Sequence, residues 1–313
     1  MKSSFKKPPR IAILMCTYNG DQFLEEQLDS IESQDYKNWT LYVNDDGSKD
    51  KTLEILKRYQ KKWGVKKLII RRGPQKGFSQ NFLRIVNDPK IKADFYFLSD
   101  QDDMWMHHKL SHSLEKLSKL DPLKPALYCA RTTYVSSDAK RILGHSDLFL
   151  KPPSFRNAIV QSLAGGNTMA FNNHLKKIAQ KYPKADVVSH DWWLYILNEL
   201  VGGQTFYDTE STIFYRQHNK SLVGANTGLV AKLRRFKMLL NGKYREYNTR
   251  HFEVFNKFNI DGLRRNLEII DRFFALRDKP LKDRLLIIKE MGIYRQTFDT
   301  HLGLYLGLIL KKI

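Results

Sequence analysis

Residues 94–105, DFYFLSDQDDMW, decide how the front of this chain is interpreted. Five largely apolar residues lead directly into three carboxylates, Asp100, Asp102 and Asp103. A short apolar run of this kind predicts a buried strand. Carboxylates held so close together repel one another, so we expect a partner that makes the cluster favourable.

The sequence around this stretch alternates strand patterns with helix patterns. Apolar runs predict strands at 11–17, 40–45, 66–71, 94–100 and 126–132, and helical spacing of apolar residues predicts helices at 21–34, 50–63, 77–87 and 107–120. Such alternation predicts an α/β fold with a mostly parallel sheet flanked by helices on both faces. The less regular middle predicts a loop entering a strand at 163–172, a helix at 189–200 and a strand at 211–219.

Polar clusters follow three of these strands. CTYNG (16–20) ends the first, NDDGSKD (44–50) ends the second and SDQDDMW (99–105) ends the fourth. Ligands of open α/β sheets bind beyond the carboxyl ends of the strands. We therefore expect the three loops to converge on one crevice.

The acidic loops also have purely structural interpretations. DQDD suits a hard divalent cation held against a pyrophosphate, but it is also typical of a solvated loop that caps the helix at 107. In NDDGSKD, Asp50 can cap the next helix, whereas Asp45 or Asp46 can accept a hydrogen bond from a nucleotide base. Residues alone leave these alternatives open.

Two missing motifs limit the kinds of active site that this sequence can form. No glycine-rich phosphate-binding motif follows the first strand, which argues against a P-loop NTPase and against a dinucleotide-dependent dehydrogenase. His108 and His112 have the spacing of one helical turn, but the Glu of the H-E-x-x-H zinc motif is missing. The sequence therefore does not favour a zinc site there.

The charge of the chain is strongly positive. The net charge is +20, and residues 225–313 hold 19 Lys and Arg against 9 Asp and Glu, half of the excess. Such a balance indicates a polyanionic neighbour: nucleic acid, an anionic membrane or phosphorylated substrates. Within this region the pattern at 228–240 predicts a basic amphipathic helix, whose apolar face comprises Leu229, Leu233, Phe236 and Leu240. Such a helix binds an anionic membrane or packs on its own domain, and we expect the membrane.

Taken together, CTYNG, VNDDGSKDKT, KGFSQNF and FLSDQDDMW resemble, in order and spacing, the family 2 glycosyltransferases of the GT-A fold. The resemblance covers residues 10–220, and SDQDDMW and FYRQHN are most similar to bacterial enzymes that transfer sugars such as rhamnose onto lipid-linked polysaccharide. It implies a GT-A-like catalytic domain at 1–223, with a nucleotide-binding half at about 10–105 and an acceptor half at about 106–223. A helical, basic C-terminal region follows at 224–313.

The resemblance assigns the donor and metal residues. It implies that the nucleotide-sugar is bound by Thr17, Tyr18, Asn19, Asp45, Asp46, Gly77, Asn81, Asp100 and Gln101. It implies that Asp102 ligates Mn²⁺ or Mg²⁺ and that His218 approaches the metal or the pyrophosphate from a late loop.

It also assigns the base and the acceptor residues. Asp191 falls where the family places its general base, although His190 stands where the family commonly has Glu. The residues implied for the acceptor are Asp103, Trp105, Gly165, Gly166, Trp192 and Trp193, with orienting Asp102 as the alternative role of Asp103. From the residues alone, the glycines equally suit a turn, and the tryptophans equally suit the core.

These roles describe an inverting, metal-dependent glycosyltransferase. The leaving nucleoside diphosphate gains negative charge, which a metal stabilises, while one separate carboxylate takes the proton of the attacking hydroxyl. We expect a dTDP- or UDP-linked donor, a glycan or lipid-linked glycan acceptor, no nucleic acid, and a cytoplasmic protein on the inner face of the plasma membrane. The alternatives are a sugar nucleotidyltransferase, for which a glycine-rich basic loop is missing, and a nucleic-acid-binding protein, which three acidic loops would disfavour.

Overall fold

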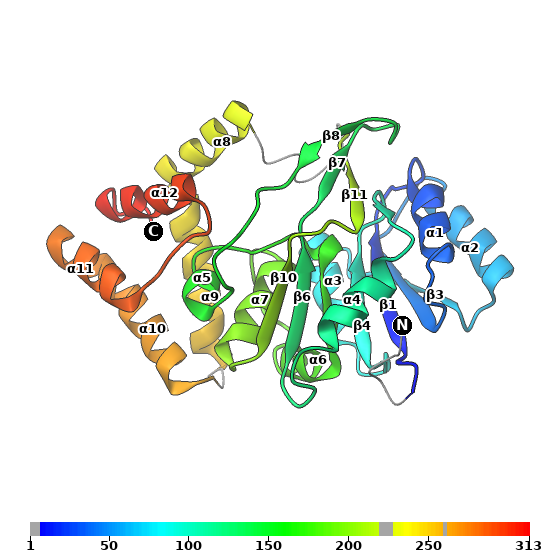
Figure 1. Cartoon of the computed structure of the whole chain (residues 1–313), viewed down its shortest axis with the longest axis horizontal. Helices are drawn as coiled ribbons and strands as arrows, with labels where there is room; N and C mark the ends of the chain where they lie inside the picture. Colours follow the sequence, from blue (N-terminus) through cyan, green and yellow to red (C-terminus); the bar gives the residue numbers. More distant parts are fainter. Residues whose placement is uncertain (1–6, 219–227, 259–261) are drawn as a thin grey trace.

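The computed structural model describes residues 7–218, 228–258 and 262–313, without the side chains of 228–231 and 258 (Figure 1). A seven-stranded sheet forms its centre. Across the sheet the strands are β10 (Gln204–Asp208), β6 (Ala126–Ala130), β9 (Ala170–Asn172), β4 (Phe95–Ser99), β1 (Ile11–Thr17), β2 (Trp39–Asp45) and β3 (Leu68–Arg72). The predicted α/β class is confirmed.

All neighbouring strands in this sheet run parallel except where β9 intervenes. β9 is antiparallel to both β4 and β6. The central strand β1 is buried along its whole length, as its uninterrupted apolar sequence predicts. Because β1, β2 and β4 are parallel, their carboxyl ends and the three polar loops meet at one edge of the sheet.

Helices cover both faces of the sheet. One core contains Ile11, Ile13 and Met15 of β1, together with apolar residues of α1 (Leu24–Glu32), α2 (Thr52–Trp63) and α4 (Lys109–Leu117). The other contains Ala12 and Leu14, together with residues of α3 (Phe78–Asn87), α6 (Asn173–Ala179) and α7 (His190–Leu200). Successive strand residues point to opposite faces, so one strand supplies both cores.

A smaller sheet lies at the edge where the polar loops meet. Its strands, in order, are β5 (Met104–Trp105), β11 (Ile213–Arg216), β7 (Thr133–Val135) and β8 (Ile142–His145). β11 pairs antiparallel with β5 and parallel with β7. This pairing brings the end of the predicted strand 211–219 beside the acidic loop that follows β4. The sequence did not predict β5, β7, β8 or β10.

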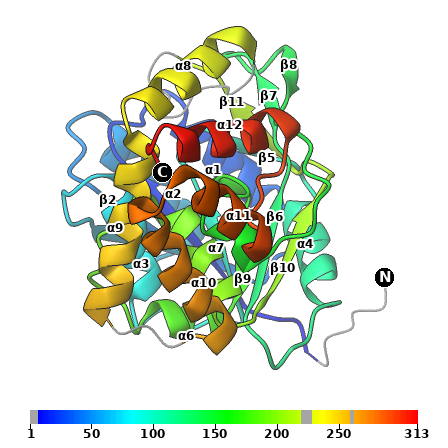
Figure 2. The ribbon, with the colours of Figure 1, turned by 90° about the vertical axis from the view of Figure 1, so that its left-hand side faces the viewer.

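The C-terminal region is helical, as predicted. Its elements are α8 (Gly228–Leu240), α9 (Lys243–Phe258), α10 (Arg264–Ala275), the 3₁₀ turn η2 (Leu276–Asp278), α11 (Leu281–Met291) and α12 (Phe298–Ile309). Two short elements lie earlier in the chain, before β9: the helix α5 (Phe155–Ala158) and the 3₁₀ turn η1 (Gly166–Thr168). The C-terminal helices lie at the end of the molecule away from β3 (Figures 1 and 2).

These helices share a core with the sheet. Phe255 of α9, Ile270 of α10 and Ile288 of α11 are buried in the same apolar cluster as α7. The predicted domain boundary at 223/224 lies outside the described residues. In the described part of the chain, no helix combines the length and the apolar character needed to cross a membrane.

Candidate active site

The loops after β1 and β2 are joined at Asp45. The Thr17 hydroxyl donates to Asp45 Oδ1 at 2.9 Å, and the backbone N–H groups of Gly47 and Ser48 donate to Oδ2 at 3.1 and 2.9 Å. Asp45 is buried, and these bonds fix the turn after β2. Thr17 is also buried, so both residues support these loops from beneath their surface.

Tyr18 and Asn19 connect the first loop to the other two. The Gln101 side-chain amide accepts from the Tyr18 N–H at 2.8 Å and donates to the Tyr18 carbonyl at 3.1 Å. Asn19 adopts a φ of 47°, accepts from the Lys49 N–H and donates from its own N–H to Ser48 Oγ, both at 2.9 Å. The three loops therefore converge as predicted, and the Tyr18 ring stays exposed above them.

Asp46 binds the loop that precedes α3. Its carboxylate accepts from the N–H groups of Gln75 at 2.6 Å and Gly77 at 3.1 Å. Gly77 has a φ of +84°, which favours glycine. Asn81 is buried and donates to the Asn44 carbonyl at 3.0 Å, while its Oδ1 has no partner among the described residues.

Asp100 lies near two other carboxylates. Burial, together with the charges of Asp102 and Asp191, raises the pKa of Asp100 to about 8. The fold therefore places Asp191, from α7, near the acidic loop after β4. Three carboxylates in one partly buried place are the kind of cluster that a bound cation makes favourable.

Asp102 meets His218 from the far end of β11. The distance between Asp102 Oδ2 and His218 Nε2 is 2.9 Å, and the imidazole lies against the Phe23 ring with centroids 4.6 Å apart. Carboxylate oxygens with one imidazole nitrogen form a donor set that suits Mn²⁺ and is compatible with Mg²⁺. The residues present therefore fit the divalent cation that the sequence implied.

Asp103 lies beneath the acidic loop and not at its surface, which favours the prediction that it orients Asp102 over the prediction that it faces the acceptor. It is fully buried, where its carboxylate accepts from Asn167 Nδ2 at 2.7 Å and from the Arg216 N–H at 3.4 Å. Burial raises its pKa well above the usual range, and the charges of Asp102 and Asp100 add to this. Asp103 therefore supports the loop that presents Asp102.

Sequence reasoning missed Arg216, the buried cation behind the acidic loop. Its Nε donates to the Asp102 carbonyl at 3.1 Å, and its guanidinium also binds Glu26 and the Ser137 carbonyl and lies over the Phe23 ring. Arg216 is 1% exposed. The signal was available in FYRQHN, where a lone Arg lies two residues before the predicted metal ligand.

Lys109 is a second buried cation near this loop. It follows DQDDMWMHH, and its ammonium lies 5.1 Å from the Trp105 ring without a hydrogen-bond partner among the described residues. Burial lowers its pKa to about 7, while the charge of Asp103 acts in the opposite direction. Lys109 therefore lies on the buried side of the acidic loop, close enough to Asp103 for their charges to interact.

Asp191 lies in the first turn of α7. Its carboxylate accepts from the Gly166 N–H at 3.1 Å and from the Trp192 N–H at 2.7 Å, which fixes its rotamer. The preceding His190 is buried and stacks on Phe82 with centroids 4.0 Å apart. Burial lowers the pKa of His190 to about 4, so this imidazole is neutral where the family commonly has Glu.

Gly165 and Gly166 make close approaches within the chain itself. A Cβ on Gly166 would lie 2.5 Å from His190 Nε2, and one on Gly165 would lie 2.8 Å from Asn167 Oδ1. Both glycines are therefore needed for the turn η1, which touches Asp191 and positions Asn167.

The three tryptophans predicted to bind the acceptor lie in the core. Trp105, Trp192 and Trp193 are 3%, 7% and 0% exposed. The Trp192 indole N–H donates to the Ala158 carbonyl at 2.7 Å, and Trp193 packs against His251 and Phe255. In this structure the three rings pack in the core and have no face at the surface, where an acceptor sugar would bind.

Comparison with known proteins identifies relatives of this arrangement. A family profile described as glycosyl transferase family 2 matches residues 12–196. The chain is 28% identical over 245 residues to the dTDP-rhamnosyl transferase RfbG of Shigella flexneri, covering 75% of this chain and 82% of that protein. It is 28% identical over 220 residues to an uncharacterized glycosyltransferase of Rickettsia typhi, covering 67% of this chain and 65% of that protein.

Solved structures share the fold at low sequence identity. TarS of S. aureus in complex with UDP superposes with a TM-score of 0.55 at 14% identity, covering 97% of this chain and 89% of that one. The mannosyltransferase PcManGT of Pyrobaculum calidifontis, in complex with GDP-Man and Mn²⁺, gives a TM-score of 0.53 at 16% identity, covering 98% and 86%. Both are similar to this chain along nearly its whole length, and they have the GT-A architecture that the sequence predicted.

Proposed function

This chain belongs to glycosyl transferase family 2, and we propose that it transfers a sugar, with inversion, from a nucleoside-diphosphate donor to a hydroxyl of a bacterial surface glycan. The observation that carries the proposal is the pairing of Asp102 with His218 beside Asp100, whose pKa also responds to the charge of Asp191. Family membership goes against the nucleotidyltransferase and the nucleic-acid-binding alternatives.

The donor would bind across the loops after β1, β2 and β4. Tyr18 exposes its ring at the surface of these loops, and Asp46 lies partly exposed beside them. We assign the ring to the nucleotide and Asp46 to the base, since a carboxylate accepts hydrogen bonds from ring N–H groups. Asp45, Asn19 and Gln101 hold the three loops in register.

Asp102 and His218 would hold the divalent cation against the diphosphate. Mn²⁺ or Mg²⁺ bound there would stabilise the charge that develops on the departing nucleoside diphosphate. Asp100, close enough to be influenced by both Asp102 and Asp191, would complete the acidic lining. Asp103 and Arg216 lie behind this lining and fix its position through hydrogen bonds. Lys109 lies near Asp103, without a hydrogen bond from its ammonium to the described residues of the loop.

Asp191 would accept the proton of the acceptor hydroxyl. An Asp is ordinarily ionised at pH 7, and hydrogen bonds from Gly166 and Trp192 hold this one in place. A hydroxyl that attacks the anomeric carbon opposite the leaving diphosphate gives inversion in a single displacement. Separate carboxylates for the cation and for the proton are the minimum that this mechanism requires.

The relatives indicate the donor class. RfbG is a dTDP-rhamnosyl transferase, and solved neighbours bind UDP, UDP-GlcNAc and GDP-Man. We propose a dTDP- or UDP-linked donor, with rhamnose as the first sugar to test and a lipid-linked glycan as the acceptor.

The basic helix α8 supports a location on the inner face of the plasma membrane. Leu233, Phe236 and Leu240 are exposed on α8, together with Lys232 and Lys237. α12 lies beside α8, and Lys232 pairs with Asp299 across them. Exposed apolar groups among cations form a surface that anionic lipid headgroups bind. The Leu229 side chain lies outside the described part of the helix.

A donor-hydrolysis screen tests the proposal because it requires no acceptor. The full chain is incubated with dTDP-, UDP- and GDP-linked sugars, with and without Mn²⁺, and the released nucleoside diphosphate is measured. Cation-dependent release from one donor supports the proposal. Absence of release and of binding for every nucleotide-sugar would contradict it.

A further inference from the structure

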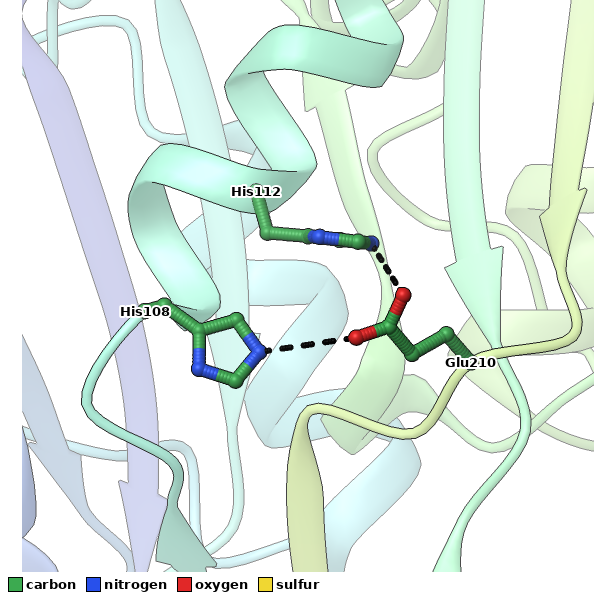
Figure 3. A group of neighbouring side chains, drawn as sticks. All are labelled: His108, His112 and Glu210. Atoms are coloured by element: carbon green, nitrogen blue, oxygen red, sulfur yellow. Dashed lines mark ion pairs between the residues drawn. The ribbon is translucent and has the colours of Figure 1, made fainter.

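We propose that His108, His112 and Glu210 form a second cation site, for a transition-metal ion such as Zn²⁺, that joins the start of α4 to the segment leading into β11 (Figure 3). This site is separate from the proposed donor site and does not depend on it. In the sequence, His108 and His112 lack the Glu of the H-E-x-x-H zinc motif. The fold brings a different carboxylate beside them, because Glu210 lies in the loop between β10 and β11.

The three side chains converge on one point. His108 precedes α4 directly and His112 lies one turn later, so both imidazoles project from the same face. His108 Nε2 lies 3.8 Å from Glu210 Oε1, and His112 Nε2 lies 3.9 Å from Glu210 Oε2. One ligand atom from each residue lies within 4.8 Å of the others. Tetrahedral metal ligands with bonds of about 2.0–2.1 Å lie about 3.4 Å apart, so small side-chain rotations would close the site.

A buried carboxylate lies behind the histidine pair. Asp208 Oδ2 is 2.8 Å from His112 Nε2, and it also accepts from the Tyr128 hydroxyl at 3.3 Å and lies 3.8 Å from Lys116 Nζ. The Asp208 side chain is 6% exposed, and this environment holds it in place. A cation at His112 Nε2 would replace the proton of that hydrogen bond and gain Asp208 as a neighbouring oxygen.

The donor set indicates the class of ion. Two imidazole nitrogens with carboxylate oxygens suit Zn²⁺ and the neighbouring first-row ions, whereas Mg²⁺ and Ca²⁺ prefer oxygen ligands. The His108 and Glu210 side chains are 44% and 58% exposed, which gives an ion access from solvent. The site therefore differs in ion preference from the carboxylate-rich donor site.

The position of the cluster suggests a structural effect. His108 follows the acidic loop through β5, and Glu210 precedes β11, which leads to Arg216 and His218. The Met106 N–H already donates to the Thr212 carbonyl between these segments at 2.9 Å. This bond adds to the pairing of β5 with β11, and a cation would add a further connection between the two segments and stabilise the fold against heat.

Zinc binding by the full chain tests the site. The protein is stripped with chelator, dialysed, and titrated with Zn²⁺ and with Mg²⁺ by calorimetry, with melting temperature measured in parallel. The chain carrying Asp102→Ala serves as the background, because it removes the donor-site ligand. We expect one Zn²⁺ per chain, a higher melting temperature with Zn²⁺ and no matching effect of Mg²⁺.

Variants then locate the ion. His108→Ala and Glu210→Gln alter exposed side chains and are expected to fold, and each should weaken Zn²⁺ affinity at least tenfold and abolish the thermal shift. His107→Ala is the matched control, since His107 is exposed and adjacent but outside the cluster. Co²⁺ absorption bands typical of four-coordinate nitrogen and oxygen ligation should appear in the parent and be lost in both variants. Undiminished Zn²⁺ affinity in both variants, or no Zn²⁺ binding by the parent, would overturn the proposal.

Discussion

His218 Nε2 lies 2.9 Å from Asp102 Oδ2, which connects the end of β11 to the loop after β4. The two residues are 116 positions apart in the chain. Their meeting depends on the pairing of β11 with β5 in the small sheet. The proposed cation ligands are thus positioned by a pairing of two short strands.

Replacing either proposed ligand should weaken cation-dependent donor binding. Asp102→Asn and His218→Ala are each expected to lower the affinity for UDP or dTDP in Mn²⁺ by about 10–100-fold, with little change in its absence. Calorimetry measures the nucleotide affinity of each variant with Mn²⁺ and without it. His174→Ala, at an exposed position, should bind as the parent does. Equal Mn²⁺ dependence in all variants would contradict the assignment.

Asp191→Asn should separate binding from catalysis. The amide keeps the size of the side chain but cannot accept the hydroxyl proton, so transfer should fall by about 10²–10⁴-fold while donor affinity stays within twofold. Steady-state transfer rates and nucleotide titrations on the same preparation measure the two effects. If transfer stays near the parent rate, the base is another residue.

Arg216→Met should destabilise the fold and disturb the acidic loop. Removing the guanidinium leaves the carbonyls of Asp102 and Ser137 without their donor, and each unsatisfied buried acceptor is expected to cost about 1–3 kcal/mol of unfolding free energy. Urea unfolding at pH 7.5 measures this. Arg141→Met, at an exposed position, should change stability by less than about 0.5 kcal/mol. A similar small change for Arg216→Met would show that the buried contacts contribute little.

The buried histidines should make stability depend on pH. Burial lowers the pKa of His251 to about 3, and the unfolded chain has the ordinary value of about 6.5, so the unfolded state binds the proton first. The unfolding free energy is therefore not reduced by this imidazole above pH 6.5, and it falls as the pH drops from 6.5 toward 3. At pH 5 the loss should be about 2 kcal/mol for this imidazole, with a further loss from His190.

The variant His251→Phe isolates that contribution. Urea unfolding measures the fall in unfolding free energy between pH 7.5 and pH 5. This fall should be smaller in His251→Phe than in the parent by about 2 kcal/mol. His174→Phe should leave the loss unchanged, because His174 is exposed. An identical pH dependence in the parent and His251→Phe would exclude His251 as a contributor.

Membrane binding should depend on the exposed side chains of α8. Leu233→Ser with Phe236→Ser is expected to reduce co-sedimentation with vesicles of 30% anionic lipid by about tenfold, since the burial of both side chains is lost. Leu123→Ser is the matched control, because Leu123 is 81% exposed on a distant loop. Equal sedimentation of all proteins would contradict a membrane role for α8.

The sequence predicted the residues whose position follows from strand direction. Asp45, Asp100 and Asp102 follow parallel strands, so their convergence required only the α/β pattern. Arg216 was missed because its partners Glu26 and Ser137 lie 190 and 79 positions away, and their proximity depends on the small sheet. The sequence also could not predict whether Trp193 faces the core or the surface. α7 is apolar on nearly every side, because C-terminal helices cover it.

The reversed strand β9 has a consequence for the geometry of transfer. It carries η1 to the edge where β4 ends, and there two consecutive residues bind the two halves of the site: the Gly166 N–H binds Asp191, and the Asn167 amide binds Asp103. The spacing between the loop that carries the proposed cation ligand and the proposed base is thereby set by a single peptide unit. A residue inserted between Gly166 and Asn167 would change that spacing while leaving every side chain of the site present.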